Sequence, residues 1–191
     1  MRLLGIVCSP RKGGNTEILV KEALKPAQEA GWETELFLMS EKQVAPCDAC
    51  GACFKTGSCV IKDDMQELYS MLEQADGVII GSPVYFGNVS AQAKAVMDRT
   101  YAIAFKRALK DKVAGAIVAA RRVGAAQARS LIYSFCIIHG MIVAAGGIGY
   151  GGDPGDVLKG VGTIGPSATA EARQVGIRVM NLAERLTKSK K

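Results

Sequence analysis

Leu3-Leu4-Gly5-Ile6-Val7-Cys8-Ser9-Pro10-Arg11-Lys12-Gly13-Gly14-Asn15-Thr16 joins a short apolar run, a polar turn with paired glycines and the start of a segment of helical period. A run of six apolar residues predicts a strand that is buried on both faces of a sheet. The polar turn then opens directly into a helix. This order of strand, turn and helix is typical of proteins built on a parallel sheet.

The turn itself has the composition of a phosphate cradle. Adjacent glycines free the backbone to turn its N–H groups inward, and the N-terminus of the following helix adds positive potential. The residues that we expect to hold the phosphate are Ser9, Arg11, Lys12, Gly14, Asn15 and Thr16. The alternative is a capped turn without a ligand, although two basic residues beside the glycines exceed what capping needs. The turn matches neither G-x4-G-K-[ST] nor G-x-G-x-x-G.

The rest of the chain repeats the alternation of strand and helix. We predict strands over residues 3–8, 36–39, 77–80, 113–119 and 141–145, and helices over 15–30, 64–75, 90–110, 124–139 and 167–187. Asp64 and Ser90 are expected to cap their helices, and Pro26 to kink or interrupt the first one. The pattern predicts one α/β domain over residues 1–191, with a doubly wound, five-stranded parallel sheet of order 2-1-3-4-5, as in flavodoxin.

The loop after the third predicted strand is rich in groups that suit a planar heterocycle. It reads Gly81-Ser82-Pro83-Val84-Tyr85-Phe86-Gly87-Asn88-Val89-Ser90. Aromatic surface, exposed backbone and an amide favour a flavin ring, which we expect to contact Pro83, Val84, Tyr85, Phe86, Gly87 and Asn88. The alternatives are aromatic residues packed in the core or at an oligomer contact.

One further glycine-rich stretch requires a different interpretation. Gly147-Ile148-Gly149-Tyr150-Gly151-Gly152 formally matches G-x-G-x-x-G, but it follows the last predicted strand and leads to Asp153-Pro154-Gly155 rather than to a helix. We interpret it as a flexible loop and leave open whether it borders the flavin.

Four of the six cysteines lie within thirteen residues, with the spacing C-x2-C-x2-C-x5-C. Cys47, Cys50, Cys53 and Cys59 are therefore candidate ligands of one [4Fe–4S] cluster, held by a loop over residues 45–60 after the second strand. This loop leaves the same sheet edge as the flavin loops, so we expect the cluster to face the flavin side, and we leave open whether it reaches the flavin of its own chain. Structural zinc and redox-active or disulfide-bonded cysteines are the alternatives. Cys8 and Cys136 are expected to be small buried hydrophobes.

Composition fits an ordinary globular protein: 191 residues, 49% of them hydrophobic, and a formal charge of +6. A four-thiolate cluster contributes about −2 and a flavin phosphate roughly −1.5 to −2, so the basic balance is weak evidence for an anionic partner. We expect no nucleic-acid partner and no membrane association, because base-reading motifs and a segment of spanning length are not found. Ligand thiolates without an export signal indicate the cytoplasm.

Together, S-P-R-K-G-G-N-T, the four-cysteine loop and G-S-P-V-Y-F-G-N resemble the iron–sulfur flavoproteins of the NADPH-dependent FMN reductase superfamily. The resemblance implies that Ser9, Arg11, Asn15 and Thr16 hold the phosphate of FMN, that residues 83–88 hold its ring, and that the four cysteines hold a [4Fe–4S] cluster. It further implies a homodimer or homotetramer that passes electrons between a ferredoxin-like donor and an acceptor, with the cluster and flavin of neighbouring subunits brought together.

One segment departs from the superfamily pattern. Many members carry an R-G-G-G-Q-E-like run after the fourth strand, whereas this chain has Arg122-Val123-Gly124-Ala125-Ala126-Gln127-Ala128. The departure argues against direct reduction by NAD(P)H. Two alternatives to an electron-transfer flavoprotein stay open. One is an NAD(P)H-dependent FMN or quinone reductase with a structural cysteine loop, and the other is a zinc-stapled α/β binding domain.

Overall fold

The computed structural model describes residues 1–159 and 167–189. Its centre is a sheet of order β2-β1-β3-β5-β6, in which neighbouring strands are all parallel. The strands are β1 (Arg2–Val7), β2 (Glu33–Leu38), β3 (Gly77–Tyr85), β5 (Val113–Ala120) and β6 (Ile142–Tyr150). A short β4 (Asn88–Val89) pairs antiparallel with the end of β3. The predicted order of the parallel strands is confirmed.

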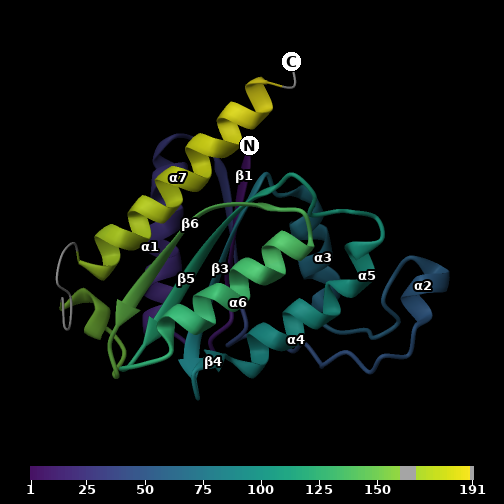
Figure 1. Ribbon diagram of the computed structural model, residues 1–191, viewed down its shortest axis with the longest axis horizontal. Coiled ribbons are helices and arrows are strands. Elements are labelled where there is room, and N and C mark those ends of the chain that lie inside the picture. The colour runs from purple at the N-terminus through teal and green to yellow at the C-terminus, as the bar shows by residue number, and fades with distance from the viewer. Residues whose placement is uncertain (160–166, 190–191) are drawn as a thin grey trace.

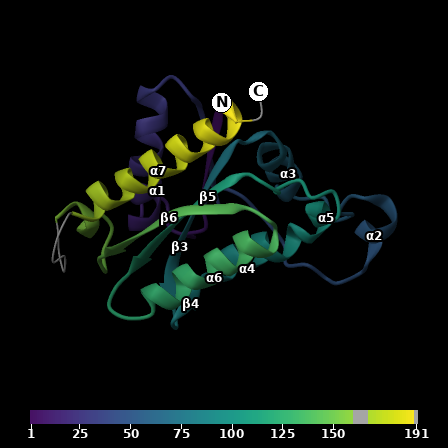
Figure 2. The same ribbon diagram turned by 45° about the horizontal axis from the view of Figure 1, so that its top comes forward.

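Helices cover both faces of the sheet (Figures 1 and 2). One face carries α1 (Asn15–Glu29) and α7 (Ala168–Lys188). The other carries α3 (Met65–Gln74), α4 (Ala91–Arg99) and α6 (Ala125–Ile138). Three short helices complete the described chain: α2 (Ala52–Thr56), α5 (Tyr101–Ala104) and the 3₁₀ helix η1 (Asp156–Leu158).

The strands are apolar throughout because both of their faces are buried. In β1, Leu3 and Val7 pack with residues of α1 and α7, whereas Leu4 and Ile6 pack on the opposite side. All four side chains are at most 1% exposed. This alternation gives each layer its own hydrophobic core. Gly5 lies in register with Leu36 of β2 and Ile79 of β3, so β1 lies between these two strands.

Several predicted helix boundaries change. The helix expected over 90–110 divides into α4 and α5, because the N–H and the hydroxyl of Thr100 both bond the carbonyl of Met97 and tighten the turn. Ser90 caps α4 as predicted, since its hydroxyl accepts the N–H of Ala93. Asp64 occupies the predicted N-cap position of α3, but its side chain makes no capping hydrogen bond; the carboxylate of Asp63 accepts the N–H of Met65 instead.

The expectation that Pro26 interrupts the first helix is wrong. Pro26 lies in the last turn of α1, where its carbonyl still accepts the N–H of Ala30. Gly31 follows with φ of +80° and ends the helical region. The proline removes one N–H donor from the last turn but does not end the helix.

The contact between α1 and α7 depends on one glycine, Gly176. A methyl group at this position would lie 1.9 Å from the carbonyl oxygen of Ala23.

We therefore expect Gly176→Ala to destabilise the protein by about 1–3 kcal/mol, despite the better helix propensity of alanine. Urea unfolding measures the loss. Gln174→Ala, at an exposed position of the same helix, is the control and should change stability little; an equally stable Gly176→Ala protein would contradict the close packing.

Candidate cofactor-binding sites

A cavity of ≈ 260 Å³ lies at the carboxyl edge of the sheet. It is formed by the ends of β3 and β5 and by the segments that follow β1, β5 and β6, because parallel strands end at the same edge. Its lining residues are Ser9, Arg11, Gly14, Asn15, Thr16, Pro83, Val84, Tyr85, Ala119, Arg121, Gly151, Gly152 and Pro154. The structure therefore brings the predicted phosphate turn and part of the predicted flavin loop to one place.

The N-terminus of α1 faces this cavity without a side-chain cap. Gly14 is the N-cap residue and has no side chain to bond the first amides of the helix. Gly13 has φ of +64°, and its N–H donates to Glu17 at 2.7 Å. Burial raises the pKa of the Glu17 carboxyl, but hydrogen bonds from Lys21 and Gly13 outweigh it and lower the pKa below its ordinary value. A fixed turn with uncapped helix amides is suited to an anion such as phosphate.

The glycine-rich segment after β6 forms the far wall of the cavity. The amide of Asn15 donates to the carbonyl of Asp153 at 2.9 Å and accepts the N–H of Gly155 at 2.9 Å. The guanidinium of Arg11 lies 3.4 Å from the carbonyl oxygen of Gly152. The segment predicted as a flexible loop is thus strand β6 as far as Tyr150, and its continuation is held against the phosphate turn.

The third predicted loop is a hairpin rather than an open loop. Strand β3 continues through Pro83 to Tyr85 and pairs with β4 across a two-residue turn at Phe86 and Gly87. Both turn residues have positive φ, +50° and +74°. Such turns match the twist of the flanking strands, which explains why the strand extends beyond the predicted residue 80.

The hairpin divides the predicted flavin contacts into two groups. Pro83, Val84 and Tyr85 line the cavity, whereas the cavity lining does not include Phe86, Gly87 or Asn88. Lys12 also lies outside the lining; its ammonium group pairs with Glu41 at 2.6 Å. Ala119 and Arg121 line the cavity without having been predicted, whereas Gly151, Gly152 and Pro154 come from the glycine-rich stretch whose place beside the flavin was left open. Arg121 carried a usable signal, because it directly follows a buried strand that ends at this edge.

A second cavity, of ≈ 330 Å³, contains the cysteine loop. Cys47, Cys50, Cys53 and Cys59 all line it, and all are free thiols. Ala49, Gly51 and Gly57 have positive φ angles, and the two glycines let the loop turn at the start and at the end of the short helix α2. Cys8 and Cys136 are buried in the core as predicted, and burial raises the pKa of each thiol to about 12.

The donor set of this cavity fits an iron–sulfur cluster in its chemistry. Four thiols line one space, and the same space is bordered by Arg99, whose Nε is a buried donor without a hydrogen-bond partner among the described residues. Within residues 1–159 and 167–189, however, no three Cys, His, Asp or Glu side chains converge as a formed metal site. The thiols must therefore draw together to hold a cluster.

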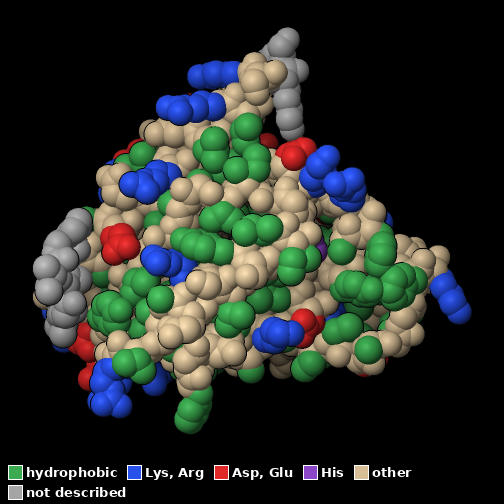
Figure 3. Space-filling view, viewed as in Figure 1, with side chains coloured by type: hydrophobic (Ala, Val, Ile, Leu, Met, Phe, Trp, Pro, Cys, Tyr) green, Lys and Arg blue, Asp and Glu red, His purple; other side chains and the backbone are tan. Residues whose placement is uncertain are grey.

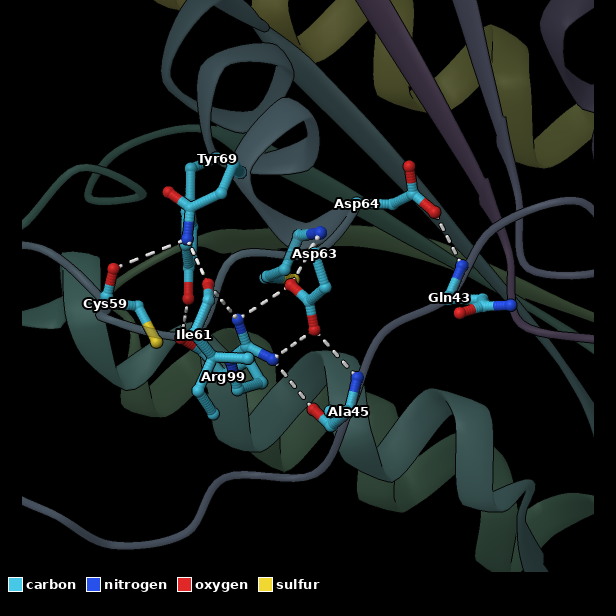
Figure 4. A network of polar contacts seen from close by, with 10 residues as sticks. Gln43, Ala45, Cys59, Ile61, Asp63, Asp64, Tyr69 and Arg99 are labelled. Atoms are coloured by element: carbon cyan, nitrogen blue, oxygen red, sulfur yellow. Dashed lines mark hydrogen bonds and ion pairs between the residues drawn. The ribbon is translucent and has the colours of Figure 1, made fainter.

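An ion pair closes the neck of the cysteine loop (Figure 4). Arg99 donates to both carboxylate oxygens of Asp63, at 2.7 and 2.9 Å, and to the carbonyl of Ala45 at 2.8 Å. The carboxylate of Asp63 also accepts the N–H of Ala45 at 2.8 Å. Burial raises the pKa of Asp63, but these partners outweigh it and lower the pKa below its ordinary value. The two ends of the loop are thus fixed to the last turn of α4.

Aromatic side chains surround the mouth of the cysteine cavity. Phe54 of α2 packs against Tyr101 and Phe105, with ring centroids 5.1 and 4.7 Å away. All three side chains are exposed, and Figure 3 shows hydrophobic side chains gathered over α2 and α5. An exposed aromatic cluster of this kind is unusual on a surface with no partner.

The two cavities are separate. They share no lining residue, and Figures 1 and 2 both show α2 projecting past α5, away from β6 and the segment after it. The cysteine loop begins at the carboxyl edge, but its two ends are bonded to Arg99 at the end of α4. The sequence left open whether the cysteine site reaches the flavin of its own chain, and the structure places the two cavities apart.

The fold and the edge cavity define the class: a flavodoxin-like α/β protein with a cavity at the sheet's carboxyl edge. The crystal structure of RosB with a bound 8-demethyl-8-formylriboflavin-5'-phosphate intermediate has a TM-score of 0.79, with 18% identity over 98% of this chain and 81% of that chain. A flavodoxin, WrbA-like protein from Agrobacterium tumefaciens has a TM-score of 0.63, with 18% identity over 96% and 97% of the two chains.

Residues 1–152 match the family model described as NADPH-dependent FMN reductase. An iron-sulfur flavoprotein of Methanocaldococcus jannaschii is 43% identical over 166 residues, which are 82% of this chain and 86% of that protein. One of Methanosarcina thermophila is 43% identical over 155 residues, covering 80% and 81%. The chain belongs to the NADPH-dependent FMN reductase family, as an iron–sulfur flavoprotein, and is a flavin-dependent oxidoreductase. None of the described helices is long and apolar enough to span a membrane.

The Asp63–Arg99 pair should dominate the stability of the cysteine loop. We expect Asp63→Asn to lower the free energy of unfolding at pH 7 by about 3–5 kcal/mol, because it leaves a buried guanidinium uncompensated. Since the pKa of Asp63 is lowered on folding, its contribution is complete above the ordinary carboxyl pKa and is lost as the pH falls through the lowered value. Urea unfolding at several pH values measures both effects.

Asp98→Asn is the matched control for this prediction. Asp98 pairs with Lys94 at 2.6 Å on the exposed side of α4, so its loss should cost about 0.5 kcal/mol or less. Equal effects of the two substitutions would show that the buried pair does not stabilise the loop.

Proposed function

We propose that the protein is an electron-transfer flavoprotein that holds FMN and one [4Fe–4S] cluster in two separate sites. The observation that carries the proposal is the gathering of Cys47, Cys50, Cys53 and Cys59 round one cavity, apart from the cavity at the sheet edge. The family match and the names of the relatives support the same pair of cofactors. When bound, the cluster exchanges single electrons and FMN exchanges one or two.

In the edge cavity, the phosphate of FMN would lie on the N-terminus of α1. Arg11 and Arg121 supply positive charge there, and Ser9, Asn15 and Thr16 supply further hydrogen-bonding groups. The isoalloxazine ring would lie against the hairpin at Pro83, Val84 and Tyr85. The part of these residues is to bind and orient the flavin, and the proposal requires no acid, base or nucleophile from the chain.

The separation of the cavities bears on how electrons would pass between them. Because the cysteine cavity opens away from the edge cavity of its own chain, transfer would run to the flavin of a neighbouring subunit in a homodimer or homotetramer. The exposed aromatic cluster of Phe54, Tyr101 and Phe105 suits such a contact. A ferredoxin or similar carrier would supply or receive the electrons, and NAD(P)H is the alternative reductant of the flavin.

Cofactor content tests the proposal directly. Protein purified without oxygen should contain about four irons and four acid-labile sulfides per FMN. Cys50→Ala should lose the iron while keeping the flavin, because Cys50 lines only the cysteine cavity. Absorption spectra with iron, sulfide, zinc and released-flavin analyses provide the measurement.

Cys136→Ala is the control, since Cys136 lies in the core and not in the cysteine cavity; it should keep both cofactors. Flavin with zinc, or with no metal, would overturn the cluster. Rapid bleaching of such a protein by NADPH would then favour a simple NAD(P)H-dependent FMN or quinone reductase.

Two adjacent basic residues test the phosphate site. Arg11 lines the edge cavity, whereas Lys12 pairs with Glu41 outside it. We expect Arg11→Ala to weaken FMN binding roughly 10–100-fold, as the loss of one charge-assisted hydrogen bond implies. Lys12→Ala, with the same loss of charge, should leave the affinity nearly unchanged. Flavin fluorescence titration of the apoprotein measures both, and equal weakening would indicate long-range attraction rather than a defined site.

A further inference from the structure

Arg99 occupies an unusual position beside the cysteine cavity. It ends α4, its side chain is 0% exposed, and it borders the same space as the four cysteines. An arginine is rarely buried so completely unless several acceptors surround it. Arg99 is also the only arginine in the lining of this cavity.

The two terminal nitrogens of Arg99 have their acceptors. Nη1 donates to the carbonyl of Ala45 at 2.8 Å and to Asp63 Oδ2 at 2.7 Å. Nη2 donates to Asp63 Oδ1 at 2.9 Å and lies 3.4 Å from the carbonyl of Ile61. These contacts account for the charge and hold the neck of the loop (Figure 4). They leave the remaining nitrogen, Nε, without a role.

Nε is buried and has no hydrogen-bond partner among the described residues. A buried donor next to a positive charge is costly to leave unpaired, and a guanidinium cannot lose its proton to relieve the cost. Asp48 and Tyr101 also line the cavity, and the carboxylate of Asp48 accepts the N–H of Cys50 at 3.2 Å. The other side-chain acceptors in the lining are the sulfur atoms of the four cysteines.

We infer that the Nε–H of Arg99 donates a hydrogen bond to a sulfur of the bound cluster, either a cysteine thiolate or a sulfide. Arg99 is then a positioning residue with two parts: its Nη atoms fix the loop that carries the cysteines, and its Nε sets the reduction potential. Donation to sulfur withdraws negative charge and favours the reduced cluster, so the potential is higher than it would be without the donor. The inference rests on the proposed cluster.

The test uses the intact protein with both cofactors, labelled with [¹⁵N]arginine and reduced without oxygen. Electron–nuclear double resonance of the reduced cluster should detect a coupled arginine nitrogen in the wild-type protein. Arg99→Lys keeps a positive charge but lacks Nε, so the coupling should vanish and the midpoint potential of the cluster should shift to more negative values. The potential of the flavin should stay the same.

Arg121→Lys is the matched control, because Arg121 borders only the edge cavity; it should keep the coupling and the cluster potential. A wild-type cluster without arginine coupling would overturn the inference even if Arg99→Lys failed to fold, and so would an unchanged potential in a fully loaded Arg99→Lys protein. Wild-type protein with flavin but no iron would instead overturn the proposed cluster, and the inference with it.

Discussion

Parallel pairing of β1 with both β2 and β3 is the constraint on which both sites depend. A parallel strand must return through a helix, so every strand ends at the same edge of the sheet. The ends of β3 and β5 and the segments after β1, β5 and β6 meet there and form one cavity. Strand β2 lies at one margin of the sheet, and the segment that follows it extends over α4 and α5 instead. The sheet order therefore separates the cysteine site from the flavin site.

Local sequence patterns were sufficient for the strands and their order, and they singled out the turn and the four cysteines that line the two cavities, because each pattern depends on neighbouring residues. Distant neighbours decided the rest. Lys12 is drawn away by Glu41, whereas Arg11 lies beside Gly152, and nothing in the spacing of the two basic residues distinguishes them. Gly151 and Gly152 enter the cavity because β6 runs further than its apolar core suggests. Arg99 lies inside the helix predicted over 90–110, and nothing in the local sequence indicates that α4 ends there or that the side chain is buried.

The basic composition acquires a different meaning in the folded protein. By itself, the formal charge of +6 is only weak evidence for an anionic partner in solution. Part of that charge is committed inside the molecule, since Arg99 is buried beside the cysteines, and Arg11 and Arg121 line the edge cavity. Each site thus places positive charge where an anionic cofactor would lie. The net charge of the apoprotein consequently overstates the charge available to outside partners.

The anchoring of the cysteine loop also affects how this fold can change over generations. One guanidinium holds both ends of the loop, at Ala45 and Ile61, while the residues between them contribute no strand to the sheet. Insertions, deletions or exchanged ligands within that span leave the pairing of β1, β2 and β3 intact. The length and the metal chemistry of the loop can therefore change in evolution while the sheet and its edge cavity keep their structure.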